Sequence, residues 1–569
     1  KYQATPTEGM AAKLPVEGST ETSTVMTFGY DPWLMEWSPF LGAQHAVAES
    51  AVKAVCLGAD WRSLRLSFQE YFEKLGDDPR RGGKPLSALL GALSAQLGLG
   101  LAAIGGKDSM SGTFRDLSVP PTLISFACGA ARAGNLRSHE LRRVGSRLFY
   151  IPCPRDEQFR ILFDILIRNL DLVRDGLADG RILSAAPVKG GGLAETISKM
   201  AFGNRLGVEL EVPAPLLGLP DPGGMVLELA EEIPELKGIF LGRVLEAQVI
   251  RLEGEELFLG EVLSAWENPL SGVFPPRPDT WPEPARQLSW SRPSGMSPRV
   301  GDSRPRVFIP VFPGTNCEYD SARAFARAGG DPVSLVFRNR NPEQVEESIQ
   351  AMAREIRRSR IIMIPGGFSA GDEPDGSGKF IAAVFRSPRI REEVMELLNG
   401  RDGLILGICN GFQALIKLGL LPYGEIRDLE PEDPTLTYNT IGRHISGYVS
   451  TRVSSVLSPW LSETSLGDMH RIAVSHGEGR FVATDEAMDR LIAAGQVATQ
   501  YVDALGMAAS RPPYNPNGSL MAVEGISSPD GRILGKMGHS ERVGDHVAVN
   551  LPGPGDQGIF RAGVRYFSL

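Results

Sequence analysis

A cysteine framed by glycines at the end of an apolar run constrains this sequence more than any other feature. Residues 404–408 predict a short buried strand, and residues 413–418 have helical character. Cys409 lies between them, with Gly407 and Gly411 on either side. A nucleophile on such a turn projects from the carboxyl edge of a sheet, where helix amides favour a thiolate and an oxyanion. An inert buried cysteine is the alternative, but the Gly-x-Cys-x-Gly frame favours a catalytic thiol.

The composition predicts a protein of several globular domains. The chain has 569 residues, 42% of them hydrophobic, and a net charge of −9. This acidic balance argues against a general nucleic-acid surface, and no apolar run is long enough to cross a membrane. Five cysteines without a Cys-x-x-Cys pair argue against a disulfide framework or a zinc site. They favour a reducing compartment, which we expect to be the cytoplasm.

A proline-rich stretch over 273–304 marks the clearest boundary in the chain. Proline favours extended, semi-rigid backbone there, so we expect an interdomain linker. Before it we expect an irregular segment over 1–24, an α+β unit over 25–133 and a second α+β unit over 134–272. After it, over 305–569, apolar strands alternate with helices. That alternation predicts a mostly parallel, doubly wound α/β sheet with its site at the carboxyl ends of the strands.

Two residues downstream can complete a catalytic triad with Cys409. Residues two apart in an extended segment share a face, so Glu541 can orient His539. A carboxylate that orients an imidazole, which in turn deprotonates a thiol, is a recurring catalytic arrangement. The alternative is that His539 is a surface histidine near the end of the sequence.

A glycine pair follows the strand predicted over 361–364. Glycine lets backbone amides approach a ligand closely, so the amides of Gly367 and Phe368, together with Asn410, are candidate oxyanion donors. A plain tight turn is the alternative. The position of the pair just before the nucleophile strand favours the functional interpretation.

Residues 407–413 resemble the nucleophile segment of class I glutamine amidotransferases, whose glutaminase domains have a flavodoxin-like α/β sheet. Asn410 and four further segments resemble the phosphoribosylformylglycinamidine synthase branch of that class, namely 365–372, 474–479, 515–518 and 539–542. The resemblance covers residues 304–569.

The resemblance implies a role for each residue of the triad. Cys409 would form a glutamyl thioester, His539 would be the base, Glu541 would orient it, and Gln413 would contact glutamine. The chain departs from the family beside the histidine: Gly538 and Ser540 stand where the family usually has proline. This removes backbone stiffness without removing a catalytic group.

A glycine-flanked loop over 105–112 has the composition of a phosphate-binding loop. Its amides can face phosphates, Lys107 can neutralise one, and Asp108 can bind Mg²⁺. A solvated turn is the alternative. The loop is similar to the nucleotide and magnesium loop in the second half of the large synthase. That similarity implies ATP and Mg²⁺ as cofactors and adds Ser109 and Ser111 to the nucleotide-binding residues.

Glu49 matches a carboxylate that ligates magnesium at the family's auxiliary nucleotide site. Four residues later the family has asparagine, whereas this chain has Lys53. An ammonium group cannot ligate Mg²⁺, and the i,i+4 spacing allows a simple ion pair. We therefore expect fewer metal ions here, with Lys53 contacting phosphate. The segment 187–193 also lacks an aspartate that relatives commonly carry.

The resemblance implies an aminoimidazole-ribonucleotide-synthetase-like half followed by the glutaminase domain. ATP would activate the formamide oxygen of formylglycinamide ribonucleotide, and ammonia from glutamine would displace phosphate to give the amidine. Only one of the family's two synthase halves precedes the linker, so we expect the other half as a partner. It would come from the same polypeptide or a separate chain, and the start at Lys1 rather than Met favours the former.

Two other functions remain open. One is a triad glutamine amidotransferase with a different ammonia acceptor. The other is a non-catalytic, nucleotide-sensing subunit in which Cys409 is inert.

Overall fold

The computed structural model describes residues 4–568 except positions 15, 17, 19, 276, 277, 279, 281, 299, 369–376, 545, 546, 548–550, 552 and 554. Residues 369–372 of the motif predicted over 365–372 lie outside this description, as do residues 276, 277, 279, 281 and 299 of the proline-rich stretch. Lys1–Ser271 and Gly272–Leu569 form two compact units, each of which is described by itself. Among the described residues, none of the helices combines the length and apolar content needed to cross a bilayer.

The first unit begins with a five-stranded sheet in the order β1-β2-β7-β3-β4. Its strands are β1 (Gly9–Lys13), β2 (Thr22–Gly29), β3 (Arg65–Tyr71), β4 (Ala103–Lys107) and β7 (Thr122–Arg132). The short hairpin β5 (Thr113–Phe114) and β6 (Leu117–Ser118) follows β4. The expectation of an irregular segment over 1–24 was wrong, because β1 pairs along its length with β2. The residues of β1, Gly-Met-Ala-Ala-Lys, are exposed or half-buried and do not alternate between apolar and polar, so periodicity does not reveal this strand in the sequence.

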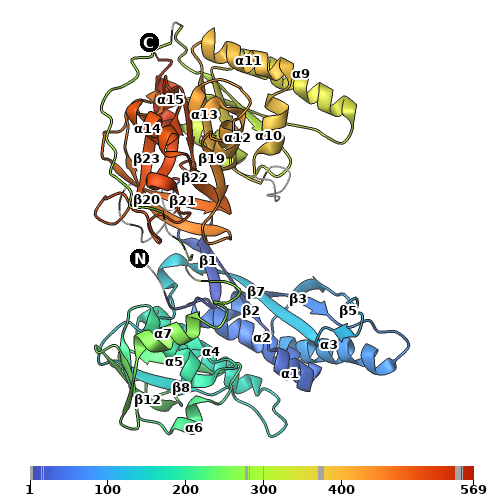
Figure 1. Cartoon of the computed structure of the whole chain (residues 1–569). Coiled ribbons are helices and arrows are strands. Elements are labelled where there is room, and N and C mark those ends of the chain that lie inside the picture. The colour runs from blue at the N-terminus through green and yellow to red at the C-terminus, as the bar shows by residue number, and fades with distance from the viewer. Residues whose placement is uncertain are drawn as a thin grey trace. The chain divides into compact units, whose positions relative to one another are not determined.

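Three helices accompany this sheet: α1 (Pro32–Trp37), α2 (Pro39–Cys56) and α3 (Pro79–Leu99). The Ser38 side chain accepts a hydrogen bond from the Leu41 amide, and Pro39 occupies the first turn, which together start α2. From Leu41 onward α2 is buried, because it packs against β2, β7 and α3 (Figure 1). The apolar residues within 45–57 predict a helix, and α2 contains this range except for its last residue and begins earlier, at Pro39.

The rest of the first unit is built on a seven-stranded sheet in the order β14-β13-β10-β12-β8-β11-β9. Its strands are β8 (Arg147–Ile151), β9 (Ile182–Pro187), β10 (Gly207–Leu210), β11 (Met225–Leu229), β12 (Ile239–Leu245), β13 (Val249–Leu252) and β14 (Glu255–Phe258). Its helices are α4 (Phe163–Asp179), α5 (Gly192–Phe202), α6 (Ala214–Leu217) and α7 (Leu259–Glu267). Most of these strands pair antiparallel, so the unit is α+β, as expected.

The second unit is organised around a nine-stranded sheet in the order β16-β15-β17-β18-β25-β24-β23-β20-β21. Its strands are β15 (Arg306–Val311), β16 (Asp331–Val336), β17 (Ile361–Ile364), β18 (Leu404–Ile408), β20 (Ile445–Val453), β21 (Met469–His476), β23 (Val497–Val502), β24 (Val523–Ser527) and β25 (Ile533–Lys536). The first five strands in that order are parallel, and their 2-1-3-4-5 arrangement is the flavodoxin-like one. The remaining four continue the sheet in antiparallel pairs, so the expected parallel sheet covers only one side.

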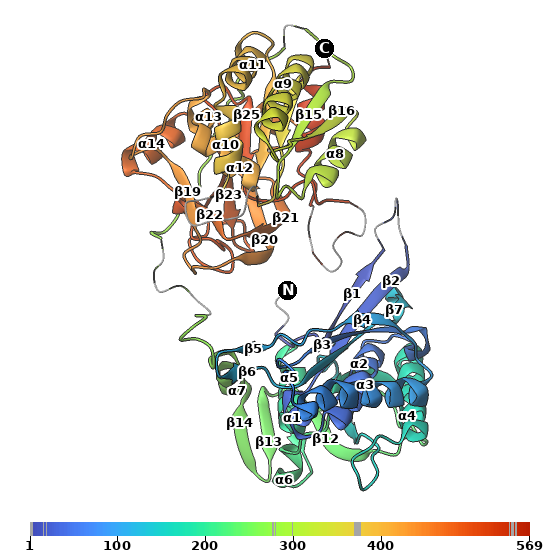
Figure 2. The same cartoon turned by 90° about the vertical axis from the view of Figure 1, so that its right-hand side faces the viewer.

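Helices of the second unit cover both faces of the parallel strands (Figures 1 and 2). The helices of this unit are α8 (Glu318–Arg327), α9 (Pro342–Arg358), α10 (Lys379–Phe385), α11 (Pro388–Asn399), α12 (Asn410–Leu418), α13 (Leu420–Tyr423), α14 (Asp485–Ala493) and α15 (Ile559–Arg565). Among these helices, α9 contacts α11, and α8 contacts α15. A separate ribbon pairs β19 (Thr435–Tyr438) with β22 (Glu478–Val482).

The described residues of the proline-rich stretch contain no helix or multi-residue strand, as its composition predicts. They are nevertheless bound to the second unit. The Trp290 amide donates to the Ser454 carbonyl at 2.9 Å, and the Leu288 amide donates to the side-chain oxygen of Gln500 at the same distance. The middle of the stretch, around residues 288–290, therefore packs against the second unit.

Candidate active site

Cys409 occupies a strained turn between β18 and α12. Its φ of 52° and ψ of −106° are unusual for any residue with a side chain, and it is the N-cap of α12. The two flanking glycines make this turn possible. A Cβ on Gly411 would lie 2.0 Å from the Ile364 carbonyl oxygen, and one on Gly407 would lie 2.5 Å from the Leu415 side chain. The glycine frame therefore brings α12 tightly against the sheet and aims Cys409 at its carboxyl edge.

His539 and Glu541 meet Cys409 at this edge, as the spacing predicts. The Nδ1 atom of His539 lies 2.6 Å from Oε1 of Glu541, and both side chains are buried. Gly366 shows how close the thiol is, because a Cβ placed there would lie 2.8 Å from Cε1 of His539 and 3.5 Å from Cβ of Cys409. The absent side chain of Gly366 thus leaves the space that the imidazole and the thiol share.

The electrostatics favour a charged imidazole and a charged carboxylate. Burial alone lowers the pKa of His539, but the Glu541 carboxylate and the sulfurs of Cys317 and Cys409 outweigh it and raise that pKa well above its ordinary value. Burial raises the pKa of Glu541, yet the imidazolium lowers it below its ordinary range. An imidazolium beside a thiol stabilises the thiolate, which is the reactive form.

A second thiol, which the sequence analysis did not identify, borders the same imidazole. Sγ of Cys317 lies 3.8 Å from Nδ1 of His539 and accepts a hydrogen bond of 3.3 Å from the Arg542 guanidinium. Cys317 is the N-cap of α8 and is 1% exposed. It lies more than 200 residues from His539 in the sequence, so only the parallel order of β15 and β17 brings it here.

One predicted oxyanion donor is already used inside the protein. The Phe368 amide donates to the Gly314 carbonyl at 2.8 Å, so the prediction for Phe368 was wrong in this structure. The Gly367 amide has no such partner among the described residues. Gly367 has a φ of 148°, and a Cβ there would lie 2.5 Å from the Gly314 oxygen, so only glycine fits. The first amides of α12 form the other edge of this space.

Asn410 and Gln413 bind each other rather than an open cavity. The Asn410 amide nitrogen donates to Oε1 of Gln413 at 2.9 Å, and Nε2 of Gln413 donates to the Glu478 carbonyl at 2.6 Å. Both side chains are buried. Gln413 therefore fixes the first residue of β22, and the carbonyl oxygen of Ser475, near the end of β21, lies 3.7 Å from the Cys409 sulfur.

Another buried histidine of this segment is unsuited to act as a base. Burial, followed by the charge of His539, lowers the pKa of His476 to about 3. Its Nδ1 lies 3.2 Å from the side-chain oxygen of Asn439. A neutral ring of this kind serves packing beside the charged His539.

The residues predicted for nucleotide binding fall into two separate groups in the first unit. Lys107 ends β4 and precedes an exposed Asp108, and the hydroxyls of Ser109 and Ser111 lie 2.8 Å apart. Burial, together with the charge of Asp108, raises the pKa of the neighbouring Glu70 to about 7. The other group lies near β2, which is separated from β4 by two strands of the sheet, β7 and β3.

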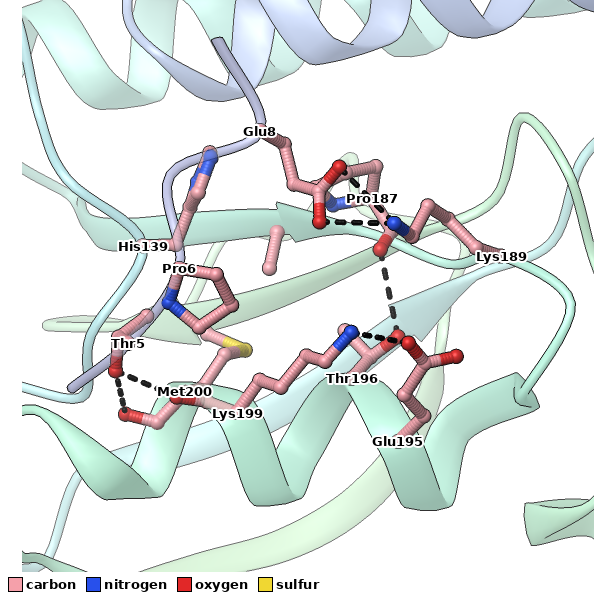
Figure 3. Close-up of a pocket in the computed structure, with 11 residues that line it drawn as sticks. Thr5, Pro6, Glu8, His139, Pro187, Lys189, Glu195, Thr196, Lys199 and Met200 are labelled. Atoms are coloured by element: carbon pink, nitrogen blue, oxygen red, sulfur yellow. Dashed lines mark hydrogen bonds and ion pairs between the residues drawn. The ribbon is translucent and has the colours of Figure 1, made fainter. Parts of the chain in front are cut away.

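That second group is an ion-pair cluster, which we define as Glu8, Glu49, Lys53 and Lys189. Nζ of Lys53 lies 2.7 Å from Glu49 and 3.5 Å from Glu8, and Lys53 is 1% exposed. The other oxygen of Glu49 accepts the Tyr30 amide at 3.2 Å. Glu8 also pairs with Lys189 at 2.9 Å, as Figure 3 shows. Both oxygens of Glu49 are thus engaged by protein groups.

The segment that carries Glu8 is held over α5. The Thr5 hydroxyl donates to the Lys199 carbonyl at 2.5 Å (Figure 3). It also accepts the Gly203 amide at 2.9 Å. The cavity beneath it measures about 20 Å³, which is room for about one water molecule. A larger cavity of about 360 Å³ lies nearby and is lined by Tyr30, Asp31, Pro32, Trp33, Glu49, Lys189, Gly190, Gly191, Glu195 and Pro222.

Comparisons with known proteins find one matching family model and several similar proteins. The family model of the CobB/CobQ-like glutamine amidotransferase domain matches residues 304–567. Subunit PurQ of phosphoribosylformylglycinamidine synthase from Chlorobium chlorochromatii is 32% identical over 249 residues, 43% of this chain and 92% of the relative. Its counterpart from Mycobacterium leprae is 33% identical over 255 residues, 45% of this chain and 93% of the relative. The solved structure of PurLQS from Thermotoga maritima is 26% identical, covering 46% of this chain and 99% of that chain with a TM-score of 0.34.

Proposed function

Because this chain belongs to the phosphoribosylformylglycinamidine synthase family, we propose that its second unit hydrolyses glutamine and delivers the ammonia to amidine synthesis. The observation that carries the proposal is the strained Cys409 turn beside an imidazole bound to a buried carboxylate. An inert cysteine would need neither a strained backbone conformation nor a neighbouring imidazolium paired with a carboxylate.

The chemistry follows from these groups. The Cys409 thiol gives its proton to His539, and the thiolate attacks the side-chain amide carbon of glutamine. The Gly367 amide and the first amides of α12 stabilise the oxyanion. His539 returns the proton to the leaving ammonia, and a thioester remains on Cys409. Water, deprotonated by the same imidazole, then releases glutamate and the free thiol.

The ammonia would react in a synthase site. There ATP activates the formamide oxygen of formylglycinamide ribonucleotide, and ammonia displaces phosphate to form the amidine. We propose that ATP with Mg²⁺ is the cofactor pair and that the loop with Lys107 and Asp108 contributes to its binding. The exposed Asp108 carboxylate has the oxygen ligands that Mg²⁺ prefers. A further synthase half, in the same polypeptide or a separate chain, would complete this site.

Glu49 does not fit the role of a magnesium ligand. Both of its oxygens are engaged, one of them by an ammonium group, and a cation in that position excludes a second one. We therefore propose that the ion-pair cluster replaces metal at this place. The exposed edge of Lys189 borders the larger cavity, so a phosphate group there would meet Lys189 rather than a metal ion.

The location that we propose is cytoplasmic. All five cysteines of the chain are free, and a nucleophilic thiol with a second thiol nearby persists in a reducing environment.

A labelling experiment tests the glutaminase proposal. The intact chain is incubated with diazo-oxo-norleucine, a glutamine analogue that alkylates glutaminase nucleophiles, and the site is mapped by mass spectrometry. We expect labelling at Cys409, its loss in Cys409→Ser, and glutamate release from glutamine in the wild type only. Absence of labelling and of glutamate release would favour the non-catalytic, nucleotide-sensing alternative. Glutamate release without amidation of formylglycinamide ribonucleotide, after addition of the missing synthase half, would favour a different acceptor.

A further inference from the structure

A buried ion pair lies directly behind the catalytic histidine. Lys536 is the last residue of β25 and is 1% exposed, and Glu524 in β24 is fully buried. Nζ of Lys536 lies 3.0 Å from Oε1 of Glu524. Burying two charges is costly unless every donor and acceptor finds a partner, so the other contacts of this pair show what it holds.

Those contacts reach both residues that flank His539. Nζ of Lys536 donates to the Gly538 carbonyl at 3.0 Å and to the Ser540 hydroxyl oxygen at 3.0 Å. Oε1 of Glu524 accepts the Gly538 amide at 2.7 Å. Both polar groups of the Gly538 backbone are therefore bound by one ion pair.

The network continues away from the histidine on both sides. The other oxygen of Glu524 accepts a hydrogen bond from the Thr499 hydroxyl. The Ser540 hydroxyl donates to the side-chain oxygen of Gln557 at 2.6 Å. The pair is thus anchored to β23 and to the segment before α15, and neither charge is left without a partner.

Lys536 also connects the histidine to the nucleophile. Its backbone carbonyl accepts the Cys409 amide at 2.8 Å, because β25 is the parallel neighbour of β18. One residue therefore binds the backbone of the nucleophile through its carbonyl and the segment around the base through its ammonium group. The separation between thiol and imidazole depends on both contacts.

We propose that Lys536 and Glu524 are positioning residues that hold the His539 imidazole toward the Cys409 thiol. This inference rests on the proposed glutaminase function. It also explains the glycine and serine at positions 538 and 540, where the family usually has proline. A proline at 538 has no amide hydrogen to donate to Glu524, and a proline at 540 has no hydroxyl for Lys536. Polar anchoring takes the place of proline stiffness in this chain.

The test compares two variants of the intact chain, neither of which leaves one buried charge alone. K536M/E524Q removes both charges of the ion pair together, whereas S540A keeps the pair and removes only its contact with the Ser540 hydroxyl. The control is D530N. It removes the ion pair between Asp530 and Arg532, which lie just before the first residue of β25. For each variant we would measure kcat and KM for glutamine, and the rate of Cys409 alkylation by iodoacetamide as a function of pH.

We expect kcat of K536M/E524Q to fall about 10–100-fold, as misplacement of a catalytic group does, with KM for glutamine almost unchanged. The alkylation profile should move to higher pH, because a displaced imidazolium no longer stabilises the thiolate. S540A should show the same changes at a smaller size, and D530N should show neither. A folded K536M/E524Q, or a folded S540A if the double variant does not fold, with the wild-type kcat and alkylation profile would overturn the proposal.

Failure of the proposed function gives a different result. If the wild type releases no glutamate from glutamine, the glutaminase proposal fails. The pH profiles of alkylation still decide whether the pair places His539 beside Cys409, since iodoacetamide requires no glutamine site.

Discussion

The two units each bury a set of ionisable groups, but they use it differently. At the edge of the second unit, His539 and Glu541 form a pair whose other neighbours are two thiols, so a proton can move onto or off a reactive atom. In the ion-pair cluster of the first unit, each carboxylate is matched by an ammonium group. An ammonium group has no acceptor to offer. The first arrangement can support catalysis. The second can only stabilise the fold and bind anions.

The strained backbone of Cys409 also distinguishes the site of the second unit from the ion-pair cluster of the first. Of the changes considered, removal of the Cys409 side chain has the largest expected effect. Cys409→Ala should lower kcat/KM for glutamine at least about 10⁴-fold, because it removes the nucleophile that forms the thioester. Cys409→Gly should be equally inactive. Glycine tolerates φ of 52°, so its free energy of unfolding should exceed that of Cys409→Ala by about 1 kcal/mol. Glutamate release and urea denaturation measure the two effects. Equal stability of the two variants would show that the turn is unstrained.

Removing the central cation of the ion-pair cluster should destabilise the first unit. Lys53→Met leaves Glu49 and Glu8 facing each other in a buried site, which should lower the free energy of unfolding by about 3–5 kcal/mol. Urea denaturation followed by tryptophan fluorescence would measure it. The double variant Lys53→Met/Glu49→Gln should recover much of that loss, since it removes the uncompensated charge. Glutaminase activity of the second unit is the control and should persist, and a Lys53→Met chain as stable as the wild type would refute the role of the cluster.

The triad carboxylate should have a smaller effect, expressed mainly in its pH dependence. Glu541→Gln should lower kcat/KM about 10²-fold, because the imidazole loses its orienting partner. Glu541 raises the pKa of His539, so the variant should have a lower His539 pKa and less imidazolium at neutral pH. The pH of half-maximal Cys409 alkylation should therefore rise. An unchanged alkylation profile would mean that Glu541 does not control the charge of the imidazole.

The same pair sets a pH window for stability. Because the pKa of His539 is raised, the imidazolium contributes to the free energy of unfolding, and this contribution is lost as the pH rises through the His539 pKa. Because the pKa of Glu541 is lowered, its carboxylate also contributes, and that contribution is lost as the pH falls through the Glu541 pKa. Between the two values both contributions are present. Thermal unfolding across pH should show this plateau in the wild type and a flatter curve in Glu541→Gln.

What the sequence predicted well depends on local rules. The glycine frame of Cys409 and the two-residue spacing of His539 and Glu541 are set by backbone geometry within a few residues, and the structure brings all three together. The apolar run over 361–364 likewise predicted a strand, and β17 has these bounds. Each of these signals lies within a single element.

What the sequence could not predict depends on distant partners. The Phe368 amide is used by Gly314, which lies on another loop, and Cys317 reaches His539 from the start of a different helix. Glu524 and Lys536 are a carboxylate and an ammonium on neighbouring strands, with no local pattern to pair them. Glu8 comes from a polar segment without periodicity. Pairing of this kind is determined by the order of strands in a sheet, which one sequence does not state.

The smallest expected effect concerns magnesium at the ion-pair cluster. A site that binds Mg²⁺ in the folded state alone gains stability as the ion is added, by mass action. Because Lys53 already occupies the carboxylates that would hold the ion, millimolar Mg²⁺ should shift the melting temperature of the first unit by less than about 1 °C. Lys53→Asn supplies an oxygen ligand in place of the ammonium group, so the same Mg²⁺ addition should raise the melting temperature of this variant measurably. Addition of Na⁺ at equal ionic strength controls for screening of exposed charges. If Mg²⁺ raised the melting temperature of the wild type as much as that of Lys53→Asn, the lysine would leave room for a metal ion. The two units would then differ only in the thiols beside the ionisable groups of the second unit.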